Sequence, residues 1–202
     1  MTTWPTKKLM EVCEIVSPGV NEFAGFKKYI ATADIDYDKI INFIKIDYKN
    51  RPSRANMEVL ENDLLVAKMA QTQKFLLASK ELQQNYIFST GFAVLRIKRE
   101  YLMPEYLFYF FTTKEFNEQK DKLATGATQK AINNNRLAKV KIFLPPISLQ
   151  SQIVSRLDAI RKAQELNAQQ IALAEELFQS LLNRELDPKG TDRKMNKLEE
   201  VA

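Results

Sequence analysis

Lysine and arginine residues are unevenly distributed along the 202-residue chain, and this distribution is the first indication of its chemistry. Residues 1–146 hold 22 of these cations against 16 acidic residues, whereas residues 147–202 hold 8 against 9. Between residues 64 and 99 there are six basic side chains and a single acidic one, Glu81. A basic surface on one part of a protein suggests a polyanionic partner. Charge alone leaves an equal alternative, a basic protein with no such partner.

Side chains suited to acid–base or nucleophilic catalysis are scarce in this sequence. There is no histidine, which excludes Ser-His-Asp and Cys-His catalysis and most zinc sites. Cys13 is the only cysteine, so it can form no internal disulfide and has no second thiol with which to bind a metal. The five glycines are scattered and form no phosphate-binding loop. The residues therefore predict no cofactor and no metal.

Two groups of charged residues leave a catalytic alternative open. Asp34, Asp36 and Asp38 alternate, so on a strand they would share one face and could hold a divalent cation. An exposed edge or loop explains these three aspartates better. Glu118 and Lys120 have the Glu-x-Lys spacing of a metal-dependent nuclease, but no upstream aspartate stands in an obvious place. We therefore interpret Glu118 and Lys120 as charged residues on a helix surface.

The first 146 residues contain short segments of mixed type that must position these side chains. Pro104 favours the start of a helix whose apolar side continues to about Leu123, before Thr125 and Gly126 end it. Polar loops are expected at 49–54 and 68–74. Runs of β-branched and aromatic residues indicate strands, which we expect at 12–16, 29–35, 40–46, 64–67, 75–78, 92–97 and 139–144.

A different kind of segment follows Pro145 and Pro146. Residues 149–186 contain no glycine and no proline, and a helix of that length would span ~55 Å, more than the width of a domain of this size. We expect a partner helix to cover its apolar seam, with two polar members of the seam setting the register. The alternative is a helix hairpin folded back on its own domain, for which there is no turn signal. The seam, with steps of three and four residues, consists of Ile153, Leu157, Ile160, Gln164, Asn167, Ile171, Ala174, Phe178 and Leu181.

These patterns predict an α+β protein, in which a mixed α/β domain is followed by one long C-terminal helix that forms a coiled coil with a partner. We expect the domain at 1–146, the helix at 147–186 and a polar linker or tail at 187–202. Residues 197–202 match residues 8–13 at four of six positions, either as the start of a second copy of the domain or by chance. No membrane span and no signal peptide are visible, so we expect a cytoplasmic protein.

One stretch near the end of the first region is similar to a known family. Residues 123–132 read LATGATQKAI and are followed by Leu137 and by 140–146, VKIFLPP. This combination resembles the end of a target recognition domain in specificity subunits of Type I restriction–modification systems. The similarity extends from Trp4 to about Leu186. It includes further stretches at 4–12, 63–69, 89–95, 150–158 and 179–182.

The resemblance implies a function and a set of partners. Specificity subunits of this family carry two recognition domains, each of which reads one half of a bipartite site in double-stranded DNA. Two long antiparallel helices fix the spacing between these domains. The subunits dock methyltransferase subunits and, through them, the restriction subunit, so that catalysis lies in those other chains.

This sequence departs from the family pattern because it contains one recognition domain and one helix. It is either a half-subunit that pairs with itself or the first half of a longer protein. In either case the isolated chain is expected to form a homodimer, because its seam needs a second helix. A two-fold dimer would read an interrupted palindrome.

Contacts to DNA phosphates need Lys and Arg, whereas base edges are read by Arg, Lys, Asn and Gln. The best candidate is the loop at 68–74, for which an ordinary hairpin connection is the alternative. The next candidates are the loop at 49–54, a loop at 17–20 with two nearby lysines, and the family-like stretch at 123–132. For the family-like stretch, packing of the domain against the helix is the alternative. The residues expected to contact DNA are Lys68, Gln71, Thr72, Gln73, Lys74, Lys49, Arg51, Arg54, Lys27, Lys28, Gln129 and Lys130.

Two other classes of function stay open beside a DNA-recognition subunit. A scaffold or assembly protein, such as an anti-restriction factor, would use the long helix and never read DNA. A metal-dependent nuclease would use Glu118 and Lys120, and its magnesium-dependent cleavage would be lost in Glu118→Ala. A motif enriched from a randomised duplex pool distinguishes the recognition subunit from the scaffold.

Overall fold

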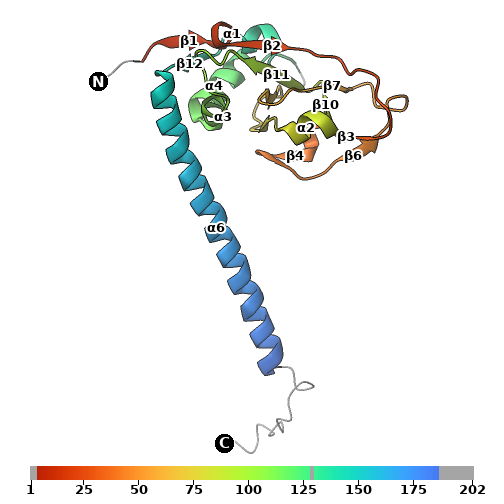
Figure 1. Cartoon of the computed structure of the whole chain (residues 1–202), viewed down its shortest axis with the longest axis vertical. Helices are drawn as coiled ribbons and strands as arrows, with labels where there is room; N and C mark the ends of the chain where they lie inside the picture. Colours follow the sequence, from red (N-terminus) through yellow and green to blue (C-terminus); the bar gives the residue numbers. More distant parts are fainter. Residues whose placement is uncertain (1–3, 128–129, 187–202) are drawn as a thin grey trace, which may run out of the picture. The chain divides into compact units, whose positions relative to one another are not determined.

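The computed structural model describes residues 4–127 and 130–186, and Figure 1 shows the order of its helices and strands. The chain forms two units, Met1–Val154 and Ser155–Ala202, and each is described by itself. The first unit is an α+β domain that contains all the strands of the described residues. The second unit continues a long helix that begins in the first. The expected fold class, a mixed α/β domain followed by one long helix, is confirmed.

A four-stranded antiparallel sheet forms the centre of the first unit. Residues of β8 and β11 are buried in runs, as expected for strands whose two faces are both covered. Alternate residues of β11 enter different apolar clusters, since Ala93 and Leu95 join one and Phe92 and Val94 join the other. The strands, in spatial order, are β2 (Cys13–Val16), β11 (Phe92–Ile97), β8 (Leu64–Ala67) and β9 (Phe75–Leu77).

Helices cover one face of the central sheet, and a second sheet covers the other. The first apolar cluster joins the central sheet to α3 (Pro104–Thr112) and α4 (Lys114–Leu123). The second cluster joins it to the second sheet, through Ile30 and Phe88 among others. In that second sheet β3 and β10 are parallel. Its strands, in spatial order, are β6 (Ile44–Ile46), β3 (Lys27–Ile30), β10 (Tyr86–Ser89) and β7 (Ala55–Met57).

Short elements complete the first unit. The pairing of β1 with β12 brings the start of the described chain beside the strand that precedes the long helix. Two small antiparallel sheets pair β1 (Thr6–Lys8) with β12 (Lys141–Phe143) and β4 (Ile35–Asp36) with β5 (Lys39–Ile40). The short helices are α1 (Leu9–Val12), α2 (Lys80–Asn85), α5 (Asn134–Leu137) and the 3-10 turn η1 (Thr32–Asp34).

The single helix expected at 104–123 is wrong, because two helices occupy this segment. Thr113 is extended between them, with φ −75° and ψ 150°. Its hydroxyl accepts the N–H of Phe116 at 3.2 Å and so caps α4. The break lets the rings of Phe111 and Phe116 stack with their centroids 4.1 Å apart. Residues five apart in one straight helix would face different sides, so core packing favours the break.

Five of the expected strands are confirmed and two are broken. Strands β2, β8, β9, β11 and β12 lie within predicted segments. The segment 29–35 is a strand only as far as Ile30, because the carboxylate of Asp34 accepts the N–H of Ala31 at 2.8 Å and stabilises η1. The segment 40–46 splits between β5 and β6. Strands β1, β7 and β10 are not predicted, because they depend on pairing with distant segments.

The long helix α6 (Ile147–Leu186) is confirmed, and its first two turns belong to the first unit. Gln150 and Val154 are buried there. The side-chain oxygen of Gln150 accepts the N–H of Met103 at 2.9 Å. Its side-chain nitrogen donates to the carbonyls of Tyr101 at 2.9 Å and Pro145 at 2.8 Å. One buried amide therefore ties the start of α6 to the loop before α3.

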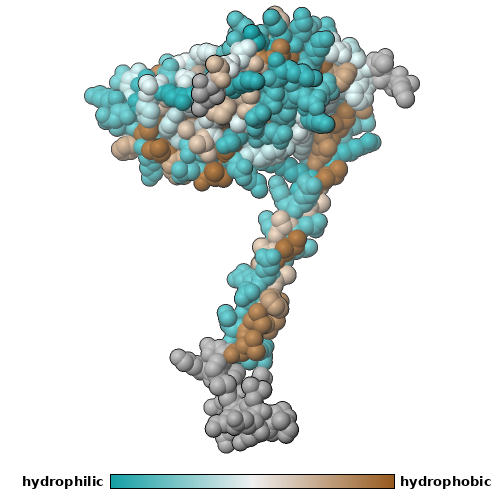
Figure 2. Space-filling model, turned by 180° about the vertical axis from the view of Figure 1, so that it is seen from behind, coloured by the Kyte–Doolittle hydropathy of each residue, from teal (hydrophilic) through white to brown (hydrophobic). Residues whose placement is uncertain are grey.

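Residues 155–186 of α6 are the only described part of the second unit. Among the described residues, that unit has no other element that could cover the apolar side chains of the helix. Ile160, Ile171 and Phe178 are 56%, 61% and 59% exposed. In Figure 2 the helix carries hydrophobic patches, coloured brown, along its length. The coiled-coil partner stays a prediction. The predicted tail at 187–202 and the repeat at 197–202 lie outside the described residues. Among the described helices, none has the length and apolarity needed to cross a membrane.

Candidate nucleic-acid interface

Five segments that are separated in the sequence meet at one cavity of about 440 Å³ in the first unit. We call this cavity the basic pocket, because Arg54, Lys68 and Lys130 line it. No acidic residue belongs to its lining. The sequence predicts these three cations as DNA contacts from separate segments, and the folded chain brings them together at one site. The other polar lining side chains are Thr32, Thr90, Thr125 and Asn133.

Backbone hydrogen bonds hold the segments of the basic pocket together. The N–H of Lys68 donates to the carbonyl of Gly91 at 3.0 Å, and the N–H of Ile132 donates to the carbonyl of Lys68 at 2.8 Å. The N–H of Thr90 donates to the carbonyl of Arg54 at 2.9 Å. Lys68 thus joins the turn between β10 and β11 to the segment that contains Ile132. Main-chain hydrogen bonds to neighbouring segments therefore hold the backbone of Arg54 and of Lys68.

Positive charge in the basic pocket is not balanced by acidic groups. None of the ion pairs formed by the described residues includes Arg54, Lys68 or Lys130. Burial, and then the positive charge of Arg54, lower the pKa of Lys68 below its ordinary value. Like charges gathered in a half-buried site repel one another, so an anion in the pocket would relieve this repulsion.

The 68–74 loop lies beside the basic pocket and is held by helix α4. A carboxylate oxygen of Asp121 accepts the N–H of Gln71 at 2.9 Å. The ammonium of Lys120 donates to the carbonyl of Thr72. Gln71 has a left-handed φ of 59°, a conformation that these contacts hold in place. The side chains of Gln71 and Gln73 are exposed on this anchored backbone.

The burial of Lys120 corrects its interpretation as a surface charge. Its side chain is 1% exposed, and burial lowers its pKa although the charge of Asp121 acts to raise it. Glu118 is on the surface and pairs with Lys114 at 3.7 Å. The two residues of the Glu-x-Lys pattern therefore lie in different surroundings, which does not favour a nuclease. Lys120 follows the buried Phe116 by one helical turn, and this spacing is the sequence signal that could have identified it.

The other candidates of the 49–54 and 68–74 loops do not line the basic pocket. Lys49 is exposed. The guanidinium of Arg51 donates to the carbonyl of Tyr48 at 2.7 Å and lies 4.1 Å from the centre of its ring. The ammonium of Lys74 donates to the carbonyl of Thr32 at 2.9 Å. Arg51 and Lys74 are thus already engaged within the domain.

Lys27 and Lys28 lie on strand β3 and not on a loop, and other groups of the domain engage both. Lys27 pairs with Glu58 at 3.2 Å. The ammonium of Lys28 donates to the hydroxyl of Tyr86 at 3.1 Å and lies 4.9 Å from the ring centres of Tyr86 and Phe43. Neither lysine lines the basic pocket. The remaining candidate, Gln129, lies outside the described residues.

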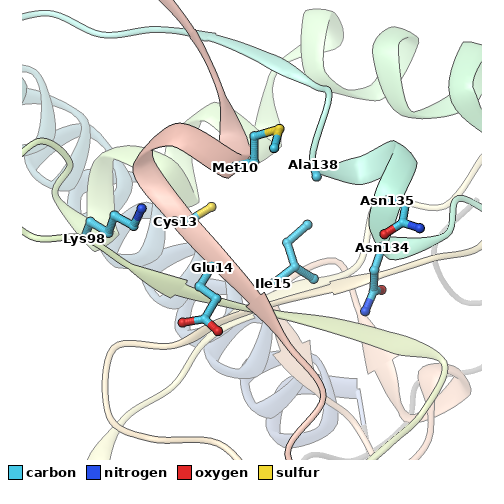
Figure 3. A pocket seen from close by; sticks show the side chains of 8 residues that line it. All are labelled: Met10, Cys13, Glu14, Ile15, Lys98, Asn134, Asn135 and Ala138. Carbon is cyan, nitrogen blue, oxygen red and sulfur yellow. The ribbon is translucent and has the colours of Figure 1, made fainter.

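A second cavity, of about 300 Å³, contains the only cysteine of the chain. Figure 3 shows residues of β2 on one side of it and Asn134 and Asn135 of α5 on the other. The thiol of Cys13 donates to the carbonyl of Leu9 at 3.0 Å. Burial raises the pKa of this thiol to about 12. Cys13 is therefore protonated at neutral pH and is a poor nucleophile.

The alternating aspartates 34, 36 and 38 do not share a strand. Asp34 ends η1 and accepts the N–H of Ala31 and the side-chain amide of Asn42, at 2.8 and 3.3 Å. Asp36 lies in β4, and Asp38 in the turn after it. In the described ranges no three His, Cys, Asp or Glu side chains are grouped so that they could hold a metal ion.

An α+β domain continued by one long helix matches about half of each solved chain described next. The structure is similar to that of the HsdS subunit from Thermoanaerobacter tengcongensis, with a TM-score of 0.66 and 27% identity over 90% of this chain and 49% of that one. Two more distant likenesses show the fold alone. One is to a structure of complex assembly in the type I R-M system (TM-score 0.73, 24% identity, 98% and 52% covered). The other is to an S subunit from M. genitalium (0.59, 17%, 93% and 47%).

Sequence comparison gives the same assignment. The family model for the Type I restriction modification DNA specificity domain matches residues 1–176, and the chain belongs to this family. A curated relative, the Type I restriction enzyme HindI specificity subunit of Haemophilus influenzae, is 23% identical over 156 residues. That match covers 76% of this chain but 34% of the relative, so the chain spans about half or less of the length of the proteins it resembles. The resemblance seen in the residues is confirmed.

Proposed function

We propose that this chain reads one half of a bipartite site in double-stranded DNA and acts as a specificity subunit of a Type I restriction–modification complex. The observation that carries the proposal is the basic pocket, where three cations that form no ion pair with a described residue meet beside a loop that exposes two glutamines. Membership of the specificity-domain family supports it. Residues 1–146 would form the recognition domain and residues 147–186 the spacer and docking helix. Methylation and cleavage would be the work of the methyltransferase and restriction chains that assemble with it.

The DNA contacts divide into two kinds. Arg54, Lys68 and Lys130 would bind the phosphate backbone and so position the domain on the duplex. Gln71 and Gln73 would read base edges, since a glutamine amide can pair with adenine through two hydrogen bonds in the major groove. The other candidates would flank these contacts, with less effect where the cation is already engaged by the domain: Lys49, Arg51, Thr72, Lys74, Lys27, Lys28 and Gln129.

The seam of α6 supports a homodimer of the isolated chain. In an antiparallel pair with a two-fold axis midway between Gln164 and Asn167, each Gln164 lies opposite an Asn167 of the other copy. The same axis sets Ile160 opposite Ile171. A shift by one seam position would set either Asn167 opposite Ile160 or Gln164 opposite Ile171, which leaves a buried amide without a polar partner. The polar pair therefore favours one register.

Selection from a randomised duplex pool tests the proposal. A recognition subunit enriches one motif, and a dimer enriches two inverted copies of it at a fixed spacing. Light scattering on the same sample gives the mass of the assembly. If a well-folded chain enriched no motif, the proposal would be wrong and a scaffold that uses only the helix would be favoured.

A further inference from the structure

We infer that the basic pocket is a binding site for one phosphate group of the DNA backbone, shared by Arg54, Lys68 and Lys130. This inference rests on the proposed function and deepens it, because it assigns one ligand chemistry to one cavity. The three cations would act together on a single phosphodiester and not on three successive ones. They would fix the position of the domain along the DNA, while the 68–74 loop discriminates between sequences.

The polar groups of the pocket suit a ligand that only accepts hydrogen bonds. Its charged side chains are all donors, and no carboxylate is present to accept from a base amino group. The edges of bases present donors as well as acceptors, whereas a phosphate presents acceptors only. Hydroxyl groups of Thr32 and Thr90 supply further donors at the lining. The pocket therefore matches a phosphate better than a base.

The shared character of the site follows from how the cations are held. Lys68 is bonded through its backbone to both neighbouring segments, at Gly91 and Ile132. The Thr90 N–H anchors the backbone of Arg54, and the Ala70 N–H anchors that of Lys130, each at 2.9 Å. Burial, and then the positive charge of Arg54, lower the pKa of the Lys68 ammonium. Cations that interact with each other inside one cavity can neutralise the same anion.

The absence of a side chain at position 91 keeps the pocket open. A Cβ atom there would lie 3.0 Å from Cγ2 of Thr32 and 3.6 Å from a terminal nitrogen of Arg54. It would crowd the site at the point where the turn between β10 and β11 meets Arg54. Glycine is therefore suited to this position because an anion needs to approach the cations closely.

Salt dependence distinguishes one phosphate from three. The observed binding constant for duplex DNA falls with salt by about 0.9 logarithmic units per decade for each phosphate that the protein neutralises. The variant Arg54→Gln/Lys68→Gln/Lys130→Gln should lower this slope by about 0.9 if the cations share one phosphate, and by about 2.7 if each binds its own. Lys114→Gln is the control, since its side chain is 90% exposed on α4 and outside the pocket. It should leave the slope unchanged.

A duplex with a single neutral methylphosphonate linkage locates the same contact from the DNA side. At one position of the enriched site this linkage should weaken binding by the wild-type chain and have no further effect on the triple variant. The three single variants, each with an unchanged melting temperature, should lose less affinity in combination than the sum of their separate losses, because they share a ligand. Inorganic phosphate should inhibit DNA binding little more than chloride does at the same ionic strength, if the pocket binds a phosphate only as part of the DNA backbone.

The outcomes separate the inference from the proposed function. A folded triple variant with an unchanged slope, or a change near 2.7, overturns the shared phosphate site while specific DNA binding stands. Strong competition by inorganic phosphate without an effect of the methylphosphonate would assign the pocket to a free anion and also overturn it. A wild-type chain that binds no duplex at low salt contradicts the proposed function itself.

Discussion

At the scale of single residues, burial decides what each ionisable side chain of this domain can do. Cys13 is fully enclosed, so its thiol stays protonated and serves packing. Lys120 is equally buried, and its ammonium is used to hold the carbonyl of Thr72. Lys68 is half-buried beside Arg54 and has no ion-pair partner among the described residues. Only the last of these environments favours the binding of an external anion.

The Cys13 thiol should make stability fall at high pH. Its pKa is about 12 in the folded domain against 9.0 for an unperturbed thiol, so the folded state retains a proton that the unfolded state loses. The contribution is fully present below pH 9.0 and is lost as the pH rises towards 12, at about 1.4 kcal/mol per pH unit. Urea denaturation at several pH values measures the slope. Cys13→Ala should show a shallower fall, and equal slopes would contradict the assignment.

Replacing Lys120 with methionine should reduce sequence discrimination more than affinity. The methionine fills the same volume but leaves the carbonyl of Thr72 without its donor, so the backbone that presents Gln71 and Gln73 is released. We expect the ratio of specific to non-specific dissociation constants to fall about tenfold, equivalent to about 1.4 kcal/mol. Lys122→Met, on the exposed side of the same helix, is the matched control. An unchanged ratio in a folded Lys120→Met protein would remove Lys120 from the positioning of the loop.

At the scale of elements, the ends of the helices determine how the helices are placed in the domain. The break at Thr113 separates α3 from α4 and lets Phe111 and Phe116 stack in the core. The same break gives α4 the direction in which Lys120 and Asp121 reach the 68–74 loop. At the other end of the domain, Gln150 secures the first turns of α6 by three hydrogen bonds. Buried polar groups at element ends thus organise the site.

Gln150→Ala should destabilise the first unit. It leaves the N–H of Met103 and the carbonyls of Tyr101 and Pro145 without their partner in a buried place. We expect a loss of about 2–4 kcal/mol in the free energy of unfolding, as for other buried groups left unsatisfied. Thermal or urea denaturation measures it. Gln152→Ala, two residues further along on the exposed side, should cost less than about 0.5 kcal/mol.

At the scale of the whole molecule, the two units differ in how their apolar side chains are covered. The first unit buries apolar clusters on both faces of its central sheet. The helix beyond Val154 has large apolar side chains that are about half exposed or more, including Leu173 and Leu177. Exposed apolar surface of this extent is typical of a protein-binding site and agrees with the proposed dimer. The proposed dimer would cover the seam and would join two recognition domains.

Phe178→Glu should convert the proposed dimer into a monomer without unfolding the domain. The carboxylate would be buried in the seam without a partner, which costs several kcal/mol at each of the two symmetric sites. Gln169→Glu, with the same added charge on the opposite side of the helix, is the control and should stay dimeric. Light scattering gives the masses, and the melting of the domain should be unchanged in both variants. A dimer that persists in Phe178→Glu would show that the seam is not the interface.

Local patterns were sufficient for the elements with long or strongly biased sequences. The 40 residues of α6, the apolar strands β8 and β11, and the polar character of the 68–74 loop follow from composition and periodicity. The short strands β1, β7 and β10 and the break at Thr113 do not, because they depend on partners from distant segments. Local propensity is a weak guide where long-range pairing decides the outcome.

The same distinction holds for the candidate site. The residue types by themselves determined that the domain is basic, that histidine chemistry is impossible and that Arg54, Lys68 and Lys130 were worth considering. Only the tertiary structure decided that these three belong to one cavity and that Lys27 is already paired with Glu58. It also decided that Lys120 lies in the core. A sequence records how many charges a chain carries, but the distance between two charges and their contact with water arise only when the chain is packed.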